Sequence, residues 1–207
     1  MSDLALHLRD HLTLSGCALA VALAVGVPLG ALLARLGTAR EAVLALVNAA
    51  RVVPSLAVLA LMLPLVGVGF APALVALVLL AIPPIAINTD LGLRGVPAAT
   101  VDAARGLGMN RRQIRARVEW PLALPVVFAG VRTATVEVIA SATLAAFIGG
   151  GGLGEYIING FASGDVPQQL EGAVSVAVLA LGADALLGAI ERRVSKDSQP
   201  DWGRQPA

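Results

Sequence analysis

The chain has 207 residues, of which 57% are hydrophobic and only 14% are charged, and its formal net charge is +1. An ordinary soluble domain carries about 25% charged residues, so this composition, with a mean hydropathy of +0.81, excludes one. A spanning helix needs roughly 20 mainly apolar residues. We therefore expect one all-α integral membrane domain of about five spans, and the near-zero net charge gives no indication of a nucleic-acid partner.

Five apolar stretches predict the transmembrane helices, and in chain order they are 12–34, 43–67, 73–91, 122–148 and 173–190. We interpret the first as an uncleaved span, because it is too long for a secretory signal and lacks a basic leader. Pro54 interrupts the second stretch, which we interpret as one broken span. Pro83 and Pro84 predict a kink or an unwound turn in the third.

Basic residues occur in alternate connections of this predicted topology. The connections after the first and third spans and the tail at 191–207 contain Lys or Arg, whereas the connections after the second and fourth spans contain neither. Short cytoplasmic loops are enriched in these residues. The pattern predicts an outer N-terminus and a cytoplasmic C-terminus. It also places the segment 96–121 in the cytoplasm.

The segment 96–121 holds a motif with a regular spacing. Asp-Ala-Ala is followed by three residues and a glycine, and nine residues later by Val-Glu-Trp-Pro. This resembles the EAA signature of ABC importer permeases, which is Glu-Ala-Ala, three residues, Gly, nine residues and Ile-x-Leu-Pro. Asp replaces Glu, Val replaces Ile and Trp replaces Leu, but the spacing is kept. A plain basic loop would account for the neighbouring arginines but not for this register.

The alanines of this motif favour a short helix, and the glycine allows the backbone to turn into a second one, so we expect two short helices at an angle. The resemblance implies the type I, methionine-importer-like permease fold, in which this element is the coupling helix that docks on a separate ATPase. The arginines that follow the glycine can anchor at the anionic leaflet or pair with acids of that ATPase. The residues predicted to couple to the ATPase are Asp102, Ala103, Ala104, Gly108, Arg111, Arg112, Val118 and Pro121.

A second resemblance concerns the transported solute. Residues 129–161 are similar to the corresponding region of permeases that import glycine betaine, carnitine or choline, and residues 51–56 and 84–89 match the same proteins, although Arg51 departs by carrying a charge. This resemblance implies an osmoprotectant importer of the bacterial inner membrane. A permease for another small solute, such as an amino acid, methionine or a sulfonate, is the alternative. An ATP-independent channel or secondary transporter is a more distant one.

The chain is not expected to hydrolyse ATP itself. A phosphate-binding loop needs Gly-x-x-x-x-Gly-Lys-Ser/Thr, and the only lysine, Lys196, stands in Val-Ser-Lys-Asp. The resemblance implies two copies of an ATPase subunit, which bind ATP and Mg²⁺, an external substrate-binding protein and a second permease copy. No cofactor is expected in this chain.

Polar residues inside the spans are candidates for the translocation path, because a charge in the membrane is costly unless it is paired or faces water. Glu137, Asp184 and Asn88 are the path candidates. A carboxylate there can attract a quaternary ammonium group, or it can pair with Arg132 and serve packing. The charged residues nearer the cytoplasmic ends are expected to be anchors or interhelical pairs: Arg51, Asp90, Arg94 and Arg132.

A glycine cluster follows the fourth span. It is interpreted as a flexible outer cap near the path, or as a simple helix terminus, and its members are Gly149, Gly150, Gly151, Gly152 and Gly154. His7 and His11 lie four residues apart on one predicted helix. Two such ligands without a third do not indicate a metal site.

Overall fold

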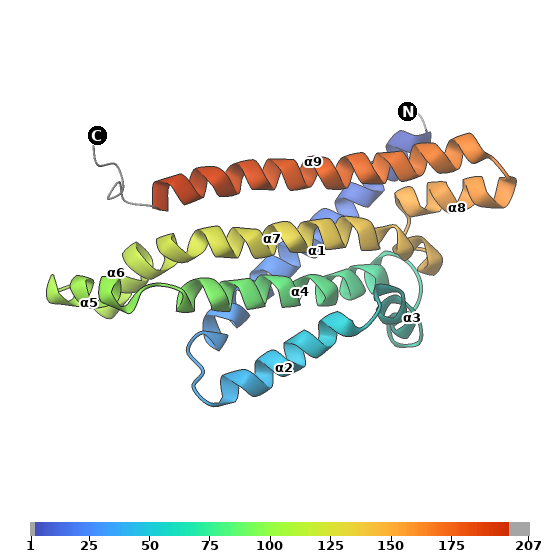
Figure 1. Cartoon of the computed structure of the whole chain (residues 1–207). Coiled ribbons are helices and arrows are strands. Elements are labelled where there is room, and N and C mark those ends of the chain that lie inside the picture. Colours follow the sequence, from blue (N-terminus) through green and yellow to red (C-terminus); the bar gives the residue numbers. More distant parts are fainter. Residues whose placement is uncertain (1–2, 199–207) are drawn as a thin grey trace, which may run out of the picture.

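A computed structural model describes residues 3–198, leaving aside the side chains of residues 50–52 and 195–198. All regular structure in this part is helical (Figure 1). The elements are α1 (Asp3–Leu33), α2 (Ala39–Val52), α3 (Ser55–Val66), α4 (Phe70–Arg94), α5 (Ala98–Gly106), α6 (Arg111–Ile114), the π-helical η1 (Arg115–Glu119), α7 (Trp120–Ala142), the 3₁₀-helical η2 (Leu144–Ile148), α8 (Leu153–Ser163) and α9 (Val166–Ser198). The predicted all-α class is confirmed.

The core forms where α1, α4 and α7 pack together, and it is built from small and aliphatic residues of these helices such as Leu14, Leu77 and Val138. Glycines let the helices approach closely. A Cβ added at Gly30 of α1 would lie 2.4 Å from a backbone oxygen of α4, and one at Gly130 of α7 would lie 2.7 Å from another. Small residues at such contacts are typical of membrane helices. Helix α9 packs against α7 and α8.

Within residues 3–198, four helical stretches are long and apolar enough to cross a membrane: α1, α4, the continuous stretch Arg111–Ala142 and the stretch Val166–Val194. The predicted second span instead comprises α2 and α3, which are separated at Val53–Pro54 and are each shorter than a span. Together α2 and α3 lead the chain from the end where α1 finishes to the end where α4 begins (Figure 1). The break at Pro54 is as predicted, and the total of five spans stays a prediction.

The third span has no unwound turn, because α4 remains helical through Pro83 and Pro84. The other predicted alternative, a kink at these prolines, stays a prediction. Both prolines are buried among neighbouring helices. Packing of this kind holds a membrane helix in shape even where proline removes backbone hydrogen bonds. One turn later, the side chains of Asn88 and Thr89 donate hydrogen bonds to the carbonyls of Pro84 and Ile85, each at 2.8 Å.

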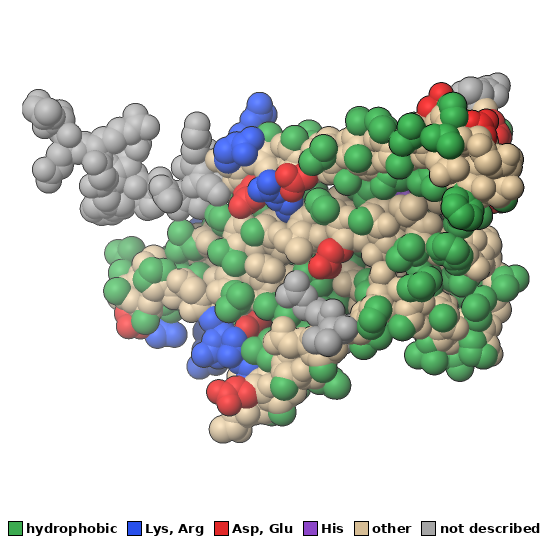
Figure 2. All heavy atoms as spheres, turned by 45° about the vertical axis from the view of Figure 1, so that its right-hand side comes forward, with side chains coloured by type: hydrophobic (Ala, Val, Ile, Leu, Met, Phe, Trp, Pro, Cys, Tyr) green, Lys and Arg blue, Asp and Glu red, His purple; other side chains and the backbone are tan. Residues whose placement is uncertain are grey.

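The two ends of the bundle differ in charge. Helices α5 and α6 lie at the end toward which α9 runs, whereas the start of α1 and helix α8 lie at the opposite end (Figure 1). On the face drawn in Figure 2, blue side chains lie toward the α5 end and none lies at the α8 end, where red ones gather. This arrangement agrees with the alternation of basic connections, and the sidedness itself stays a prediction.

Candidate functional site

The predicted coupling segment projects from one end of the bundle. Helix α5 starts after Pro97 and ends at Gly106, with Leu107 as its C-cap, and Gly108 then adopts φ +81°, in the left-handed region that favours glycine. The N–H of Met109 donates to the carbonyl of Ala104 at 3.2 Å, which closes the helix in the manner of a glycine C-cap. The predicted helix and the predicted turn at Gly108 are both present.

The second half of the segment is not a separate short helix, which corrects the expectation of two. Asn110 begins it with a capping box, since its side chain accepts the N–H of Gln113 at 3.0 Å and its own N–H donates to the Gln113 side chain at 2.8 Å. From there α6 continues through η1 into α7, as one helical stretch from Arg111 to Ala142. Pro121 follows the π-helical turn η1 inside this continuous stretch and does not interrupt it.

The motif residues of α5 present a mostly exposed surface. Asp102 and Ala103 are exposed, and Asp102 accepts a hydrogen bond from Arg105 at 2.7 Å. Ala104 points inward and is buried. Leu107 is 83% exposed at the tip. The projecting, partly apolar surface is suited to docking on another protein.

The remaining motif positions lie along the second helix. Arg111 and Arg112 are exposed in its first turn, whereas Val118 and Pro121 are half-buried at the entry to α7. The motif therefore spans the complete connection from the tip of the segment to the membrane helix. This placement fits a transmitting element, and the individual coupling roles stay predictions.

Two of the path candidates, Glu137 and Asp184, line one hollow between α7 and α9. It measures about 440 Å³. The lining residues are Ala129, Arg132, Thr133, Val136, Glu137, Asp184 and Glu191. Three carboxylates and one guanidinium thus face this space, so its lining carries an excess of negative charge.

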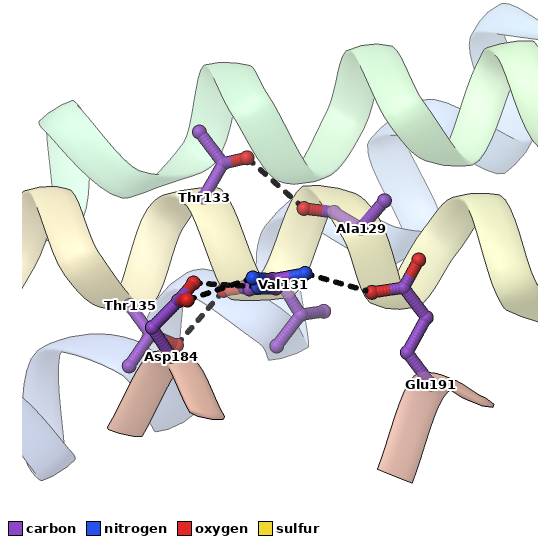
Figure 3. A network of polar contacts seen from close by, with 7 residues as sticks. Ala129, Val131, Thr133, Thr135, Asp184 and Glu191 are labelled. Atoms are coloured by element: carbon purple, nitrogen blue, oxygen red, sulfur yellow. Dashed lines mark hydrogen bonds and ion pairs between the residues drawn. The ribbon is translucent and has the colours of Figure 1, made fainter. Parts of the chain in front are cut away.

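The guanidinium of Arg132 holds α7 and α9 together at this hollow. It donates to both carboxylate oxygens of Asp184, at 2.5 Å and 2.7 Å, and lies 3.5 Å from Glu191 (Figure 3). A Cβ added at Gly188 would lie 3.2 Å from the guanidinium carbon, so this glycine provides the notch in which Arg132 rests. The alternative that a carboxylate pairs with Arg132 is confirmed for Asp184. Glu137 lies beside this pair and has a contact of its own.

Asn88, the third path candidate, lies apart from this hollow. Its amide donates to the carbonyl of Pro84, and its side chain packs where Gly130 brings α7 against α4. The structure does not bring it together with Glu137 and Asp184. A packing role accounts for its contacts, and its path role stays a prediction.

The glycine cluster forms the turn between η2 and α8, at the end opposite the coupling segment. Gly149, Gly151 and Gly152 have positive φ, and Gly150, Gly152 and Gly154 are buried. A Cβ at Gly154 would lie 1.9 Å from the backbone oxygen of Thr143. The cluster is therefore a close-packed junction as well as a helix terminus, and its role as an outer cap stays a prediction.

His11 is a buried polar residue of this junction that sequence reasoning considered only as a metal ligand. Its Nε2 donates to the carbonyl of Ile139, near the end of α7, at 3.1 Å, and its ring packs against Gly152. His7 instead packs against Tyr156 in a tilted arrangement, with ring centroids 5.6 Å apart. Within residues 3–198, apart from the side chains set aside above, no metal-binding cluster is found. Because the hydrogen bond between His11 and Ile139 joins residues far apart in the sequence, no local sequence pattern predicts it.

Helices α8 and α9 are joined at the same end by Tyr156, which donates a hydrogen bond to Glu171 at 3.0 Å. This hydrogen bond, with some burial and the nearby acids, raises the pKa of Tyr156.

Among the charged residues predicted as interhelical pairs, Asp90 is confirmed as the partner of Arg40. The side chain of Arg51 lies outside the described residues.

The fold and the projecting motif together define a membrane-spanning permease subunit of a binding-protein-dependent ABC importer. The chain matches the family described as "Binding-protein-dependent transport system inner membrane component" over residues 26–196, and it belongs to this family.

The chain is similar to several osmoprotectant permeases. It is 42% identical over 186 residues to the choline transport system permease protein OpuBB of Bacillus subtilis, covering 90% of this chain and 86% of that one. Identity and coverage are the same for the glycine betaine/carnitine/choline transport system permease protein OpuCB of B. subtilis. The osmoprotectant import permease protein OsmY of Salmonella typhimurium is 41% identical, over 90% of this chain and 80% of its own length.

Among solved structures, an inward-facing form of the methionine ABC transporter MetNI matches with a TM-score of 0.77. The sequence identity is 24%, and the match covers 90% of this chain and 93% of the other. This likeness confirms the predicted type I importer permease fold.

Proposed function

We propose that the chain forms the translocation path of an ATP-driven importer of glycine betaine, carnitine or choline. The observation that carries the proposal is its similarity, at 41–42% identity over nearly the whole chain, to permeases named for these solutes. The working assembly comprises two copies of this permease, two ATPase subunits that bind ATP and Mg²⁺, and an external substrate-binding protein. The permease itself catalyses no bond chemistry.

The assembly lies in the bacterial inner membrane, with the N-terminus outside and the C-terminus in the cytoplasm. Supporting this orientation, α5 and the basic side chains on the face drawn in Figure 2 lie toward one end of the bundle, and the acidic turn around α8 lies at the other. Arg9, near the start of α1, is an exception. The coupling segment then faces the ATPase, and the glycine junction faces the external binding protein.

The continuity of α6, η1 and α7 gives this coupling a mechanical route. The 32 residues from Arg111 to Ala142 form one helical stretch, about 48 Å long at 1.5 Å per residue. Displacement of the coupling segment by the ATPase is transmitted along this stretch to Arg132, Glu137 and the glycine junction. Because Arg132 is paired with Asp184, α9 moves with α7.

The hollow at Glu137 and Asp184 is the part of the path that a quaternary ammonium solute would meet. Its excess of carboxylates favours a cation. Only 3% of the residues are aromatic, so aromatic faces for a cation cage are scarce. Solute selection therefore belongs to the external binding protein, and the permease provides passage.

The direct test is transport by the permease reconstituted in vesicles with its ATPase and binding protein. We expect ATP-dependent uptake of glycine betaine, carnitine or choline, and none of methionine. Uptake of methionine alone would contradict the solute class. Uptake that persists without the ATPase and follows an ion gradient would contradict the importer mechanism.

A substitution at Gly108 tests the coupling segment. Gly108→Val places a β-branched side chain at φ +81°, which costs about 1–2 kcal/mol for that backbone. We expect the ATPase to dissociate or to hydrolyse ATP without uptake, while membrane insertion is unchanged. Gly37→Val is the control, because this glycine also has open space around it but no positive φ. Normal uptake by Gly108→Val would refute the coupling role.

A further inference from the structure

A cluster of arginines at the α5 end of the molecule surrounds a hollow of about 220 Å³. Helix α5 contributes Arg105, and the stretch from α6 to η1 contributes Arg111 and Arg115. Ile114 forms an apolar wall, and Glu119 is the single acid of the lining. Three guanidinium groups thus face one small space on the surface.

A second hollow, of about 160 Å³, shares Arg115 and Glu119 with the first. It adds Arg35, from the turn after α1, and Trp120, from the start of α7. Its other lining residues are apolar: Ala31, Ala34 and Leu93. The two hollows adjoin at Arg115 and Glu119, and we call them together the groove. Its side toward α5 is strongly basic, and its side toward the membrane helices adds the few apolar residues Ala31, Ala34 and Leu93.

The charges of this groove are not balanced inside the chain. Arg105 is paired with Asp102, and both side chains are largely exposed. For Arg35, Arg111 and Arg115, no ion-pair partner is found among the side chains that the structure describes. Four arginines against the single lining acid Glu119 leave the groove positively charged, and planar guanidinium groups match phosphate oxygens in bidentate geometry.

We propose that this groove binds the phosphate of an anionic phospholipid, with the headgroup between the arginines and the upper part of an acyl chain along the apolar wall. Trp120 supports a lipid over a soluble phosphate, because tryptophan concentrates at the level of the lipid headgroups. Basic pockets between helices on the cytoplasmic side are sites of this kind. The proposal rests on the membrane placement given above but not on the transported solute.

Trp120 provides a reporter within the site. The chain has two tryptophans, so the full-length variant Trp202→Phe leaves Trp120 as the only indole. Reconstituted into bilayers that contain dibrominated phosphatidylglycerol or dibrominated phosphatidylcholine, its fluorescence reports which lipid lies beside it. We expect phosphatidylglycerol to quench at a lower mole fraction. Equal quenching by the two lipids would overturn the proposal.

Removing the arginines tests the assignment. In the Trp202→Phe background, Arg111→Gln with Arg115→Gln should weaken the preference for phosphatidylglycerol by about fivefold for each arginine removed. The control is Arg117→Gln with Arg193→Gln, which removes the same charge from residues outside the groove and should keep the preference. An equal loss in both variants would indicate only general attraction to a charged surface and would overturn the site. Arg35→Gln, outside the coupling segment, gives the same test should the double variant fail to fold.

Two other occupants are distinguished in the same system. If inorganic phosphate abolishes the difference between the lipids at constant ionic strength, while chloride does not, the site takes a soluble phosphate and the lipid assignment is wrong. If the Arg111→Gln and Arg115→Gln variant keeps its lipid preference but releases the ATPase, the arginines bind an acidic surface of the partner instead. Neither result depends on which solute is transported.

Discussion

Two arginine–aspartate pairs with nearly the same geometry lie in different surroundings. Arg40 of α2 donates to both oxygens of Asp90 in α4, at 3.0 Å and 2.5 Å, and Arg132 of α7 does the same to Asp184 in α9, at 2.5 Å and 2.7 Å. The Asp90 side chain is fully buried and that of Arg40 is 18% exposed, whereas Arg132 and Asp184 are 37% and 35% exposed.

The difference in exposure suggests different roles for the two pairs: Arg40–Asp90 stabilises the fold, and Arg132–Asp184 takes part in transport. A buried carboxylate must keep its partner, since burying a charge without one is costly. The partly exposed pair faces a hollow that is also lined by Glu137 and Glu191, and its guanidinium lies 3.5 Å from Glu191 as well. We therefore expect the first pair to govern folding and the second to govern transport.

The largest effect is expected from Asp90→Ala. It removes a fully buried partner and leaves Arg40 without its carboxylate, which is strongly destabilising. The folded fraction, measured by size-exclusion chromatography of the detergent-extracted permease, should fall about tenfold or more. Asp184→Ala is the matched substitution and should leave most of the protein folded. Similar losses in the two variants would remove the distinction between the pairs.

A smaller effect, on transport and not on folding, is expected from substitutions in the partly exposed pair Arg132–Asp184. Arg132→Gln and Asp184→Asn should each lower ATP-driven uptake severalfold, because α9 is no longer tied to α7. The double variant should cost about as much as either single one, since both remove the same contact. Losses that multiply in the double variant would show that the two side chains act separately.

The smallest effect is expected from substituting Gly188, the glycine against which the Arg132 guanidinium packs. Gly188→Ala places a Cβ 3.2 Å from the guanidinium carbon, and the flexible end of the arginine can shift to relieve the contact. Uptake should fall by less than in Asp184→Asn. Gly182→Ala is the control: it lies on the same helix and gains helix propensity as Gly188→Ala does, but its added Cβ meets only open space. Equal uptake in the two variants would show that the notch does not position Arg132.

Most of the architecture could be predicted from local patterns. The apolar stretches, the break at Pro54 and the turn at Gly108 depend on short-range hydropathy and backbone sterics, so a single sequence reveals them. Of the two alternatives predicted at Pro83 and Pro84, the unwound turn is absent, because packing keeps α4 helical. The prediction of a second short helix was wrong, because the capping box at Asn110 starts a helix that runs on into α7.

By itself, the sequence determined a membrane protein with a coupling motif in register, because hydropathy and spacing are properties of neighbouring residues. Only the tertiary structure decided which charges meet. Arg40 and Asp90 are 50 residues apart, Arg132 and Asp184 are 52 apart, and His11 and Ile139 are 128 apart. The sequence named Arg132 as a partner for a carboxylate, but the choice of Asp184 depends on how α9 packs on α7. Such contacts follow from the packing and rotation of whole helices, which no local pattern specifies.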